Sequence, residues 1–386
     1  MRIALVHDYL KEYGGAESVL EALSDIFPDA PIYTTLYCPG SFGPHRTRLT
    51  QKWSHRIHQS FFQYLPFASK LISPLRLLSP LAFNLMNFTN FDLIITSATG
   101  AYFPNALNKK TARLVCYCHT PPRYLYNLPT ARNLKKYPLI NFFATIANHW
   151  LRLFDFQYAQ NVDQFIANSR TTALRIQKFY RKDSIIINPP VDLAKEAKQS
   201  NFSRAIMSAK RQRVSTKNFV CEPYFLTGGR LARAKRYDIA IEACNKLKLP
   251  LKVFGRDFAG FESELKKISG PTIEFLGEIT QQQKAELFSQ TQGYIFCSDN
   301  EDFGIVSVEA QSYGCPVIGY ASGGIKETVI DGKTGILFND LTPDSCVTAI
   351  QKLQKLKIDS PTCIQNAQNF SKEKFITKIK KIILAP

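Results

Sequence analysis

Hydrophobic and polar positions alternate in two successive series along this 386-residue chain. Short apolar runs have the length of buried strands, and each is followed by a stretch with helical spacing, as in a parallel sheet covered on both faces. In the first series a strand over the opening residues precedes a turn at Gly14 and Gly15 and a helix from about Ala16 to Ile26. Its further strands begin at Asp92, Arg113, Gln164 and Ser184, and those of the second series at Tyr224, Leu251, Ile273, Gly293, Pro316 and Gly335.

The segment Asn188–Asp192, with the sequence NPPVD, interrupts this rhythm. Two consecutive prolines continue neither a helix nor a central strand, so the segment predicts a domain boundary. A polar, basic stretch over 194–217 follows, for which we expect one helix and a surface loop. We therefore predict an α/β protein of two Rossmann-like domains, residues 1–190 and 191–370, with parallel sheets facing a central cleft. The last residues, 371–386, are expected to form a helix that packs back on the N-terminal domain.

Composition places the chain among globular proteins, because 45% of its residues are hydrophobic and 21% are charged. No apolar run reaches the roughly 18 residues that a membrane span needs, and the first strand meets Asp8 too soon for a signal peptide. These observations predict a cytoplasmic protein. The nine cysteines are scattered apart from Cys116 and Cys118, which strand alternation puts on one face. No zinc-like spacing accompanies that pair, so we expect small apolar residues in a reduced protein and no metal site.

The formal net charge of +18 favours an anionic partner. Because zinc-finger and RNA-binding signatures are absent from the sequence, nucleic acid ranks below phosphorylated ligands and an anionic membrane surface. The segment Trp53–Phe88 is rich in aromatic residues and leucine but carries Lys70 and Arg76. It fits either a membrane interface or a buried helical excursion of the first domain.

The strongest chemical signal is the segment Glu301–Gly324, EDFGIVSVEAQSYGCPVIGYASGG. It follows an apolar strand, which places Glu301 in a loop at the carboxyl end of that strand, where open α/β sheets bind ligands. The helix that follows directs its free amides to the same place, which suits a diphosphate. Glu309 lies farther along that helix, where a carboxylate can accept hydrogen bonds from ribose hydroxyls. Gly314 and Pro316 are the expected stop signal.

Two glutamates in this arrangement, before a Gly-Gly turn, resemble the signature of family 4 retaining glycosyltransferases, which have the GT-B fold. The resemblance extends over nearly the whole chain, in the expected order: GGAE at Gly14, CHTPPRY at Cys118, GGRLARAKRYD at Gly228 and DGKTGILF at Asp331. It implies a donor-binding C-terminal domain and an acceptor-binding N-terminal domain.

The resemblance also implies roles for individual residues. Arg230 and Lys235 follow a strand end and would stabilise charge on the leaving diphosphate in place of a metal ion. Glu301 would bind the donor sugar, and His119, at a strand end before two prolines that indicate an exposed loop, would contact the transferred sugar. We predict as catalytic Glu301, Arg230, Lys235 and His119; as donor-binding Gly14, Gly15, Gly229, Phe303, Gly304, Ile305, Glu309, Gly323 and Gly324; and as acceptor-side Arg123 and Tyr124.

The substrates follow from the resemblance alone. The HTPPRY and EDFGIVSVE segments resemble bacterial mannosyltransferases of surface polysaccharide synthesis, which use GDP-mannose and commonly a lipid-linked glycan acceptor. The nucleotide sugar would be a substrate, with no cofactor and no metal, and Asp299 with Glu301 is not taken as a metal motif. Two alternatives stay open: a GT-B sugar-nucleotide epimerase, and a non-catalytic basic protein that binds membrane or nucleic acid.

Overall fold

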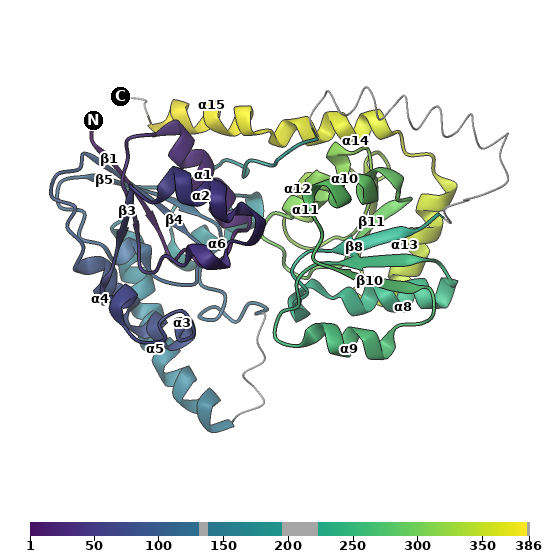
Figure 1. Ribbon diagram of the computed structural model, residues 1–386, viewed down its shortest axis with the longest axis horizontal. Coiled ribbons are helices and arrows are strands. Elements are labelled where there is room, and N and C mark those ends of the chain that lie inside the picture. The colour runs from purple at the N-terminus through teal and green to yellow at the C-terminus, as the bar shows by residue number, and fades with distance from the viewer. Residues whose placement is uncertain (131–137, 195–222, 384–386) are drawn as a thin grey trace. The chain divides into compact units, whose positions relative to one another are not determined.

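The computed structural model describes residues 1–130, 138–194 and 223–383, and of 138–143 the backbone only. The chain divides into two compact units: unit 1 comprises Met1–Pro190 with Lys372–Pro386, and unit 2 comprises Val191–Ser371 (Figure 1). The prolines of the NPPVD segment, Pro189 and Pro190, close the first part of unit 1. The helix and loop expected over 194–217 lie, Ala194 apart, outside the described residues.

Unit 1 is built on a parallel sheet of seven strands in the order β3-β2-β1-β4-β5-β6-β7. Four neighbouring strands in its centre are buried apolar runs that the sequence predicted, whereas β2 and β3 were missed. The strands are β1 (Ile3–His7), β2 (Ile32–Thr34), β3 (Ile57–Gln59), β4 (Leu93–Ala98), β5 (Arg113–Cys118), β6 (Gln164–Ala167) and β7 (Ser184–Ile186).

Helices cover both faces of this sheet, because alternate residues of each strand point to opposite faces. One face carries Leu5, Ile95 and Tyr117 and packs against α1, α2 and α15; the other carries Val6, Ile94 and Cys116 and packs against α4, α5 and α6. The helices of unit 1 are α1 (Gly15–Ile26), α2 (Arg46–Trp53), α3 (Ile72–Leu75), α4 (Ser79–Asn84), α5 (Pro138–Gln160), α6 (Arg170–Tyr180) and α15 (Lys372–Ile383).

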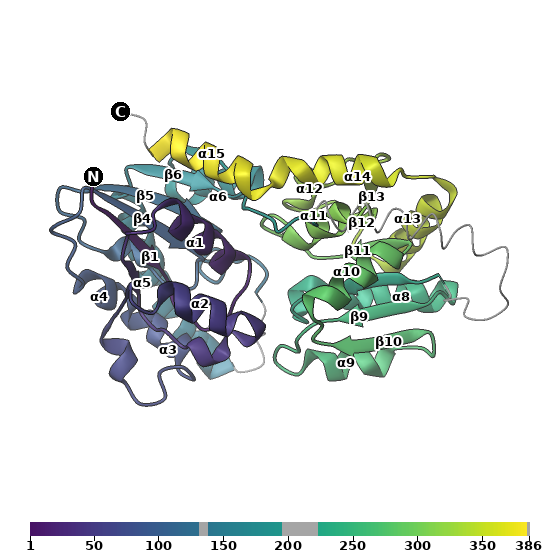
Figure 2. The same cartoon turned by 45° about the horizontal axis from the view of Figure 1, so that its top comes forward.

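The last helix, α15, belongs to unit 1 and lies beside α1 (Figures 1 and 2). Its apolar residues recur every three or four positions, so that Phe375, Ile379 and Ile383 enter the same core as the inner face of α1. At the start of the helix, Lys372 Nζ lies 2.8 Å from Asp25 Oδ2.

Unit 2 contains a parallel sheet of six strands in the order β10-β9-β8-β11-β12-β13. The chain leaves β8 in one direction to form β9 and β10 and returns to its other side with β11, so the strand order reverses between β8 and β11. The strands are β8 (Phe225–Gly228), β9 (Leu251–Phe254), β10 (Ile273–Gly277), β11 (Gly293–Phe296), β12 (Val317–Tyr320) and β13 (Gly335–Phe338).

Two buried clusters fill the faces of the unit 2 sheet. One lies under α8, α9 and α13, and the other under α10, α11 and α12. The helices of unit 2 are α8 (Tyr237–Leu247), α9 (Phe261–Ile268), α10 (Gln281–Gln290), α11 (Ile305–Ser312), α12 (Ile325–Thr328), α13 (Pro343–Lys355) and α14 (Ser360–Ala367). Helix α11 ends just before Gly314, whose φ of +77° is the left-handed conformation that the stop signal requires.

The aromatic segment Trp53–Phe88 is neither one helix nor wholly buried. Short helices and the strand β3 share it; Trp53, Phe62 and Phe83 are fully buried, whereas Tyr64 and Phe67 are 84% and 71% exposed. Among the helices of the described residues, none has both the length and the apolar character needed to cross a bilayer.

Candidate functional site

The first polar cluster lies in unit 2, where the strand order reverses between β8 and β11. The loop after β8 carries Lys235 and the loop after β11 carries Glu301, and Lys235 Nζ lies 2.5 Å from Glu301 Oε2. Ser298 Oγ donates to the same carboxylate oxygen at 2.6 Å. Because ligands of open α/β sheets bind at the carboxyl ends of strands where the order reverses, this ion pair lies where a ligand is expected.

The backbone of Glu301 is held by the Gly-Gly turn that the sequence singled out. Glu301 and Gly323 form a parallel bridge, and the amide of Gly324 donates to Glu301 O at 2.8 Å. A Cβ on Gly323 would lie 2.1 Å from Glu301 O, and one on Gly324 would lie 2.4 Å from Phe303 Cα. Both glycines therefore allow the loop after β12 to touch the Glu301 loop. The Gly324 amide, predicted to bind donor, is already bonded to the protein.

The loop after β8 also depends on a close backbone contact, here between two glycines. Gly229 has a φ of +125°, and its carbonyl oxygen would lie 1.6 Å from a Cβ on Gly255 in the loop after β9. Arg230 follows Gly229, is exposed, and lies with its guanidinium 5.4 Å from the centre of the Phe258 ring. Lys235 thus contacts Glu301 directly, whereas Arg230 extends over an aromatic ring at the surface.

Glu309 lies on α11 and pairs with a residue that the sequence analysis did not select. Lys284 on α10 places Nζ 2.5 Å from Glu309 Oε2, and the two side chains are only 18% and 15% exposed. Glu309 Oε1 has no hydrogen bond within the described part of the chain, so one carboxylate oxygen remains for a ligand hydroxyl.

The other predicted donor residues around α11 divide into backbone and core positions. Gly304 is the N-cap of α11 with a φ of +88°, a conformation that favours glycine. Phe303 is 2% exposed and packs on Phe370 with ring centres 5.4 Å apart. Ile305 packs against the small apolar cluster that contains Phe303 and Phe370. Any contact of Phe303 with a donor would therefore use its backbone.

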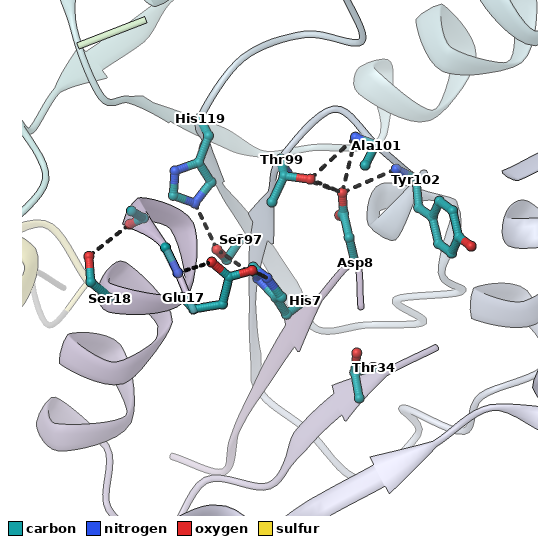
Figure 3. A network of polar contacts seen from close by, with 12 residues as sticks. His7, Asp8, Glu17, Ser18, Thr34, Ser97, Thr99, Ala101, Tyr102 and His119 are labelled. Carbon is teal, nitrogen blue, oxygen red and sulfur yellow. Dashed lines mark hydrogen bonds and ion pairs between the residues drawn. The ribbon is translucent and has the colours of Figure 1, made fainter. Parts of the chain in front are cut away.

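The second polar cluster lies in unit 1 and connects β1, β4, β5 and α1 (Figure 3). His119, directly after β5, places Nε2 2.9 Å from Ser97 Oγ, and His7 Nδ1 lies 3.1 Å from the same hydroxyl oxygen. His7 Nε2 lies 3.7 Å from Glu17 Oε1 in the first turn of α1. All four side chains are buried. Burial, together with the neighbouring His7, lowers the pKa of His119 to about 3, so that its ring is neutral.

The glycines of the GGAE segment begin α1 next to this cluster. Gly14 is the N-cap, and its amide donates to Glu17 Oε2 at 2.9 Å, while Gly15 is the first helical residue. The same carboxylate therefore caps the helix through one oxygen and faces His7 through the other.

The expectation that the prolines after His119 mark an exposed loop is wrong. His119 is 9% exposed, and Thr120, Pro121 and Pro122 are buried. The neighbouring loop approaches closely at Gly100, where a Cβ would lie 2.6 Å from Thr120 O. Asn168 Nδ2 donates to His119 O at 2.9 Å. Packing of adjacent loops, which the prolines do not reveal, covers the segment.

The acceptor-side residues Arg123 and Tyr124 follow in the same segment. Arg123 Nη1 donates to Pro129 O at 3.1 Å. The Tyr124 ring lies under the guanidinium of Arg76, whose central carbon is 3.9 Å from the ring centre. The Tyr124 hydroxyl is buried without a hydrogen bond among the described residues. Tyr124 and His119 thus make different contacts: Tyr124 stacks on a cation, and His119 ends a hydrogen-bonded row.

Asp8 directly follows His7 in the chain and was not selected as a site residue. Its Oδ2 accepts hydrogen bonds from Thr99 Oγ1 and from the amides of Ala101 and Tyr102 at 2.5, 3.2 and 3.1 Å. Burial raises the pKa of Asp8. The signal that could have found these groups is the position of His7, Asp8 and Ser97 at the carboxyl ends of apolar runs, where a purely structural strand would continue with apolar residues.

In the part of the chain that the structure describes, no group of three or more His, Cys, Asp or Glu side chains is arranged so that it could hold a metal ion. Cys116 and Cys118 both enter the apolar core of unit 1. Asp299 Oδ1 instead accepts from Ser322 Oγ at 3.2 Å.

Two Rossmann-like parallel-sheet units, with polar clusters at their strand ends, define the GT-B class of fold. Two family profiles match consecutive parts of the chain: "Glycosyltransferase Family 4" over residues 13–195 and "Glycosyl transferases group 1" over residues 208–370. Together the two matches span most of the chain, and they support a family 4 glycosyltransferase of the GT-B type.

Individual relatives are distant. The α-1,3/1,6-mannosyltransferase of Schizosaccharomyces pombe is 27% identical over 292 residues, covering 66% of this chain and 53% of the relative. A D-inositol 3-phosphate glycosyltransferase of Geodermatophilus obscurus is 25% identical over 244 residues, covering 58% and 52%. The chain thus spans about half the length of these curated relatives.

Solved structures share the fold over the full chain. The crystal structure of HepE from Anabaena with UDP and glucose superposes with a TM-score of 0.68 at 20% identity, covering 100% of both chains. Sucrose-phosphate synthase from Thermosynechococcus elongatus gives a TM-score of 0.71 at 16% identity, covering 100% of this chain and 98% of the other. At these identities the likeness shows the fold alone.

Proposed function

We propose that this chain is a retaining glycosyltransferase that moves mannose from GDP-mannose onto a lipid-linked saccharide or another glycan. The observation that carries the proposal is the Lys235–Glu301 pair at the strand-order reversal of unit 2. An ion pair at a ligand-binding edge, with Ser298 on the same carboxylate, is suited to recognising a polar ligand that carries both negative charge and hydroxyls.

Each group has a distinct chemical task in this proposal. Arg230 and Lys235 stabilise the negative charge that grows on the leaving diphosphate, and the amides at the start of α11 add to that effect. Glu301 accepts hydrogen bonds from the donor sugar, and Glu309 Oε1 accepts from a ribose hydroxyl. No metal or cofactor is required.

Glu301 is not assigned as a nucleophile. Its Oε2 already accepts from Lys235 and Ser298, and a carboxylate held by a cation and a hydroxyl is a weak nucleophile. Retention of configuration is therefore attributed to front-side attack assisted by the leaving phosphate. In unit 1, His119 supplies a neutral ring for a hydroxyl of the transferred sugar.

The choice of mannose is supported by the similarity to the mannosyltransferase of Schizosaccharomyces pombe. The structural neighbour HepE, in contrast, was solved with UDP and glucose. Thermal denaturation across GDP, UDP, ADP and their sugar conjugates separates these donors. A ligand at 100 times its dissociation constant adds about 2.7 kcal/mol of stability. Stabilisation confined to guanine nucleotides supports GDP-mannose as the donor. A preference for uridine nucleotides rejects GDP-mannose but remains consistent with a glycosyltransferase.

Substitution of Glu301 tests the site itself. Glu301→Ala should abolish the stabilisation by the sugar conjugate and most of the transfer activity while the free protein stays folded. Glu286→Ala is the matched control, because Glu286 is an exposed carboxylate of the same unit. Equal donor binding by both variants contradicts the proposal, and donor consumption without an acceptor indicates the epimerase alternative.

We further propose that unit 1 attaches to the inner face of an anionic membrane, which would bring a lipid-linked acceptor to the enzyme. The support is a set of large apolar side chains that are at least two-fifths exposed on two segments packed on one sheet face. They are Tyr64, Phe67, Leu71, Leu77, Leu78, Leu81 and Leu85, and on α5 Ile146, Trp150, Leu153 and Phe154. Exposed large apolar side chains that gather on segments of the same sheet face are typical of interaction surfaces.

Flotation with vesicles containing anionic lipid tests the attachment. Phe67→Ser combined with Leu85→Ser should reduce salt-sensitive binding, since these side chains are 71% and 67% exposed and their loss leaves the core intact. Leu174→Ser, at a leucine on α6 that is 65% exposed, is the control. Binding that is absent, or equally reduced by the control, removes the membrane from the proposal.

A further inference from the structure

The buried row of side chains from Glu17 through His7 and Ser97 to His119 has a direction that follows from counting its protons (Figure 3). Ser97 Oγ lies within hydrogen-bond distance of one nitrogen of each imidazole, His7 Nδ1 at 3.1 Å and His119 Nε2 at 2.9 Å. The hydroxyl has one proton, so it donates to one ring and can accept from the other. Ser97 Oγ has no other hydrogen-bond partner among the described residues, so its proton goes to one of the two rings. The nitrogen that accepts it is bare, and the nitrogen of the other ring is protonated and donates to the hydroxyl oxygen.

Glu17 decides which of the two arrangements is stable. Its Oε2 is occupied by the amide of Gly14 at 2.9 Å, and its Oε1 faces His7 Nε2 at 3.7 Å. That nitrogen has no other hydrogen-bond partner within the described residues. A bare nitrogen would direct its lone pair at the carboxylate in a buried site, which is repulsive, whereas an N–H is attracted. A neutral His7 therefore carries its proton on Nε2.

The rest of the row follows. His7 Nδ1 is bare and accepts from the Ser97 hydroxyl, and Ser97 Oγ accepts from His119 Nε2–H. His119 is neutral because burial holds its pKa at about 3, so its Nδ1 has no proton. Within the described part of the chain His119 Nδ1 has no hydrogen-bond partner, and it is the acceptor that the row leaves for a ligand.

We propose that Glu17, His7 and Ser97 are positioning residues that fix the tautomer of His119, so that His119 Nδ1 accepts a hydrogen bond from a hydroxyl of the bound sugar. The proposal deepens the proposed function and rests on it for the identity of the ligand, but the tautomer itself is a property of the free protein. The row is held rigidly, because Glu17 and His119 are 7% and 9% exposed and His7 and Ser97 are fully buried.

An isosteric substitution should reverse the row. In Glu17→Gln the side-chain carbonyl must still accept from the Gly14 amide to cap α1, which turns the NH₂ group toward His7 Nε2. His7 Nε2 then becomes the acceptor, His7 Nδ1–H donates to Ser97, and Ser97 donates to His119 Nε2. His119 Nδ1 acquires the proton and changes from acceptor to donor.

Nitrogen-15 NMR of ¹⁵N-histidine-labelled full-length protein measures this directly, because protonated and bare imidazole nitrogens have well-separated shifts. The chain has six histidines, and His119→Gln and His7→Gln assign the two signals. Spectra are recorded at pH 8.5, well above the ordinary histidine pKa of about 6.5. The wild type should show His119 protonated on Nε2, and Glu17→Gln should show it protonated on Nδ1.

Two further variants separate positioning from general damage. Ser97→Ala breaks the row, so adding Glu17→Gln to it should leave the His119 signal unchanged. Glu21→Gln, at a buried carboxylate one turn along α1 that bonds Tyr13 instead of His7, should leave the wild-type tautomer. An unchanged His119 tautomer in Glu17→Gln, or a changed one in Glu21→Gln, overturns the proposal. If Glu17→Gln does not fold, Ser97→Ala alone provides the test. A His119 signal in Ser97→Ala that is the same as in the wild type then overturns the proposal.

Deoxyfluoro donors test the contact with the sugar. Fluorine cannot donate a hydrogen bond, so at one ring position the wild type should lose roughly three- to tenfold in kcat/KM, and Glu17→Gln should lose less. If the NMR result holds but no fluorinated position is discriminated, the row is correct and the sugar contact of the proposed function fails. If the tautomer does not change, the row itself is wrong whatever the kinetics.

Discussion

Replacing Gly323 by alanine tests whether the approach of two loops in unit 2 holds Glu301 in place. Gly323 has a φ of +76°, and a Cβ there would lie 2.1 Å from Glu301 O, 2.8 Å from Glu301 N and 3.0 Å from Glu301 C. All three neighbours are backbone atoms, so no side chain can rotate away to make room. The Glu301 backbone must retreat by more than an ångström to reach ordinary contact at 3.4 Å.

Gly332 provides a matched control for the backbone conformation. Its φ is +73°, almost the same as that of Gly323, but a Cβ there would meet nothing within 4 Å. Alanine in the left-handed region costs about 1–2 kcal/mol by itself. Gly332→Ala should therefore lose about that much unfolding free energy, and Gly323→Ala should lose more by the cost of displacing the loop.

The effect on function should be larger than the effect on stability. A displacement of about 1 Å at a catalytic group can cost about 10²-fold in rate. Gly323→Ala should therefore reduce kcat/KM by about two orders of magnitude, whereas Gly332→Ala keeps wild-type kinetics. Urea unfolding and initial rates of nucleoside diphosphate release are measured for both variants. The reasoning is refuted if Gly323→Ala keeps wild-type kinetics, or if Gly332→Ala loses as much activity.

Two further predictions concern buried charge. Lys284→Met removes the partner of Glu309, whose side chain is 15% exposed, and should cost about 2–3 kcal/mol of unfolding free energy. The double variant with Glu309→Gln should recover most of this loss. An equal loss in the single and the double variant would contradict a buried pair. Burial raises the pKa of Asp155 to about 7, although hydrogen bonds from Tyr126 and Tyr180 act in the opposite direction. The folded state therefore holds the proton of Asp155 more tightly than the unfolded state does. Stability should therefore fall as the pH rises from about 4 to about 7, and Asp155→Asn should flatten this slope in urea unfolding at a series of pH values.

The fold was predictable wherever a strand is a continuous apolar run. The runs that begin at Asp92, Arg113 and Gln164 became β4, β5 and β6, because strands buried on both faces have few polar positions. Strands β2 and β3 have three residues each, and in β3 His58 and Gln59 are exposed. β7 is equally short, but a run of isoleucines after Ser184 identified it. β2 and β3 have no such apolar run, and pairing with the neighbouring strands decides that they form.

The site was predictable as far as chain topology determines it. Glu301 and Lys235 lie in loops at the carboxyl ends of strands, which the order of elements places at one edge of the sheet. Their contact joins residues 66 positions apart, and the partner of Glu309 comes from a helix with no motif. Such pairs depend on how helices pack, which one sequence does not record.

The two units hold their polar groups by different physical means, and this determines which substitutions each tolerates. In unit 2 the loops meet backbone to backbone, since Gly229 touches Gly255 and Gly323 touches Glu301. Adding one methyl group there should be as damaging as removing a charged side chain. In unit 1 the row that ends at His119 is joined by side-chain hydrogen bonds between buried residues at the carboxyl ends of central strands. There a substitution that preserves shape but moves one proton should change the chemistry presented to a ligand while leaving the packing intact.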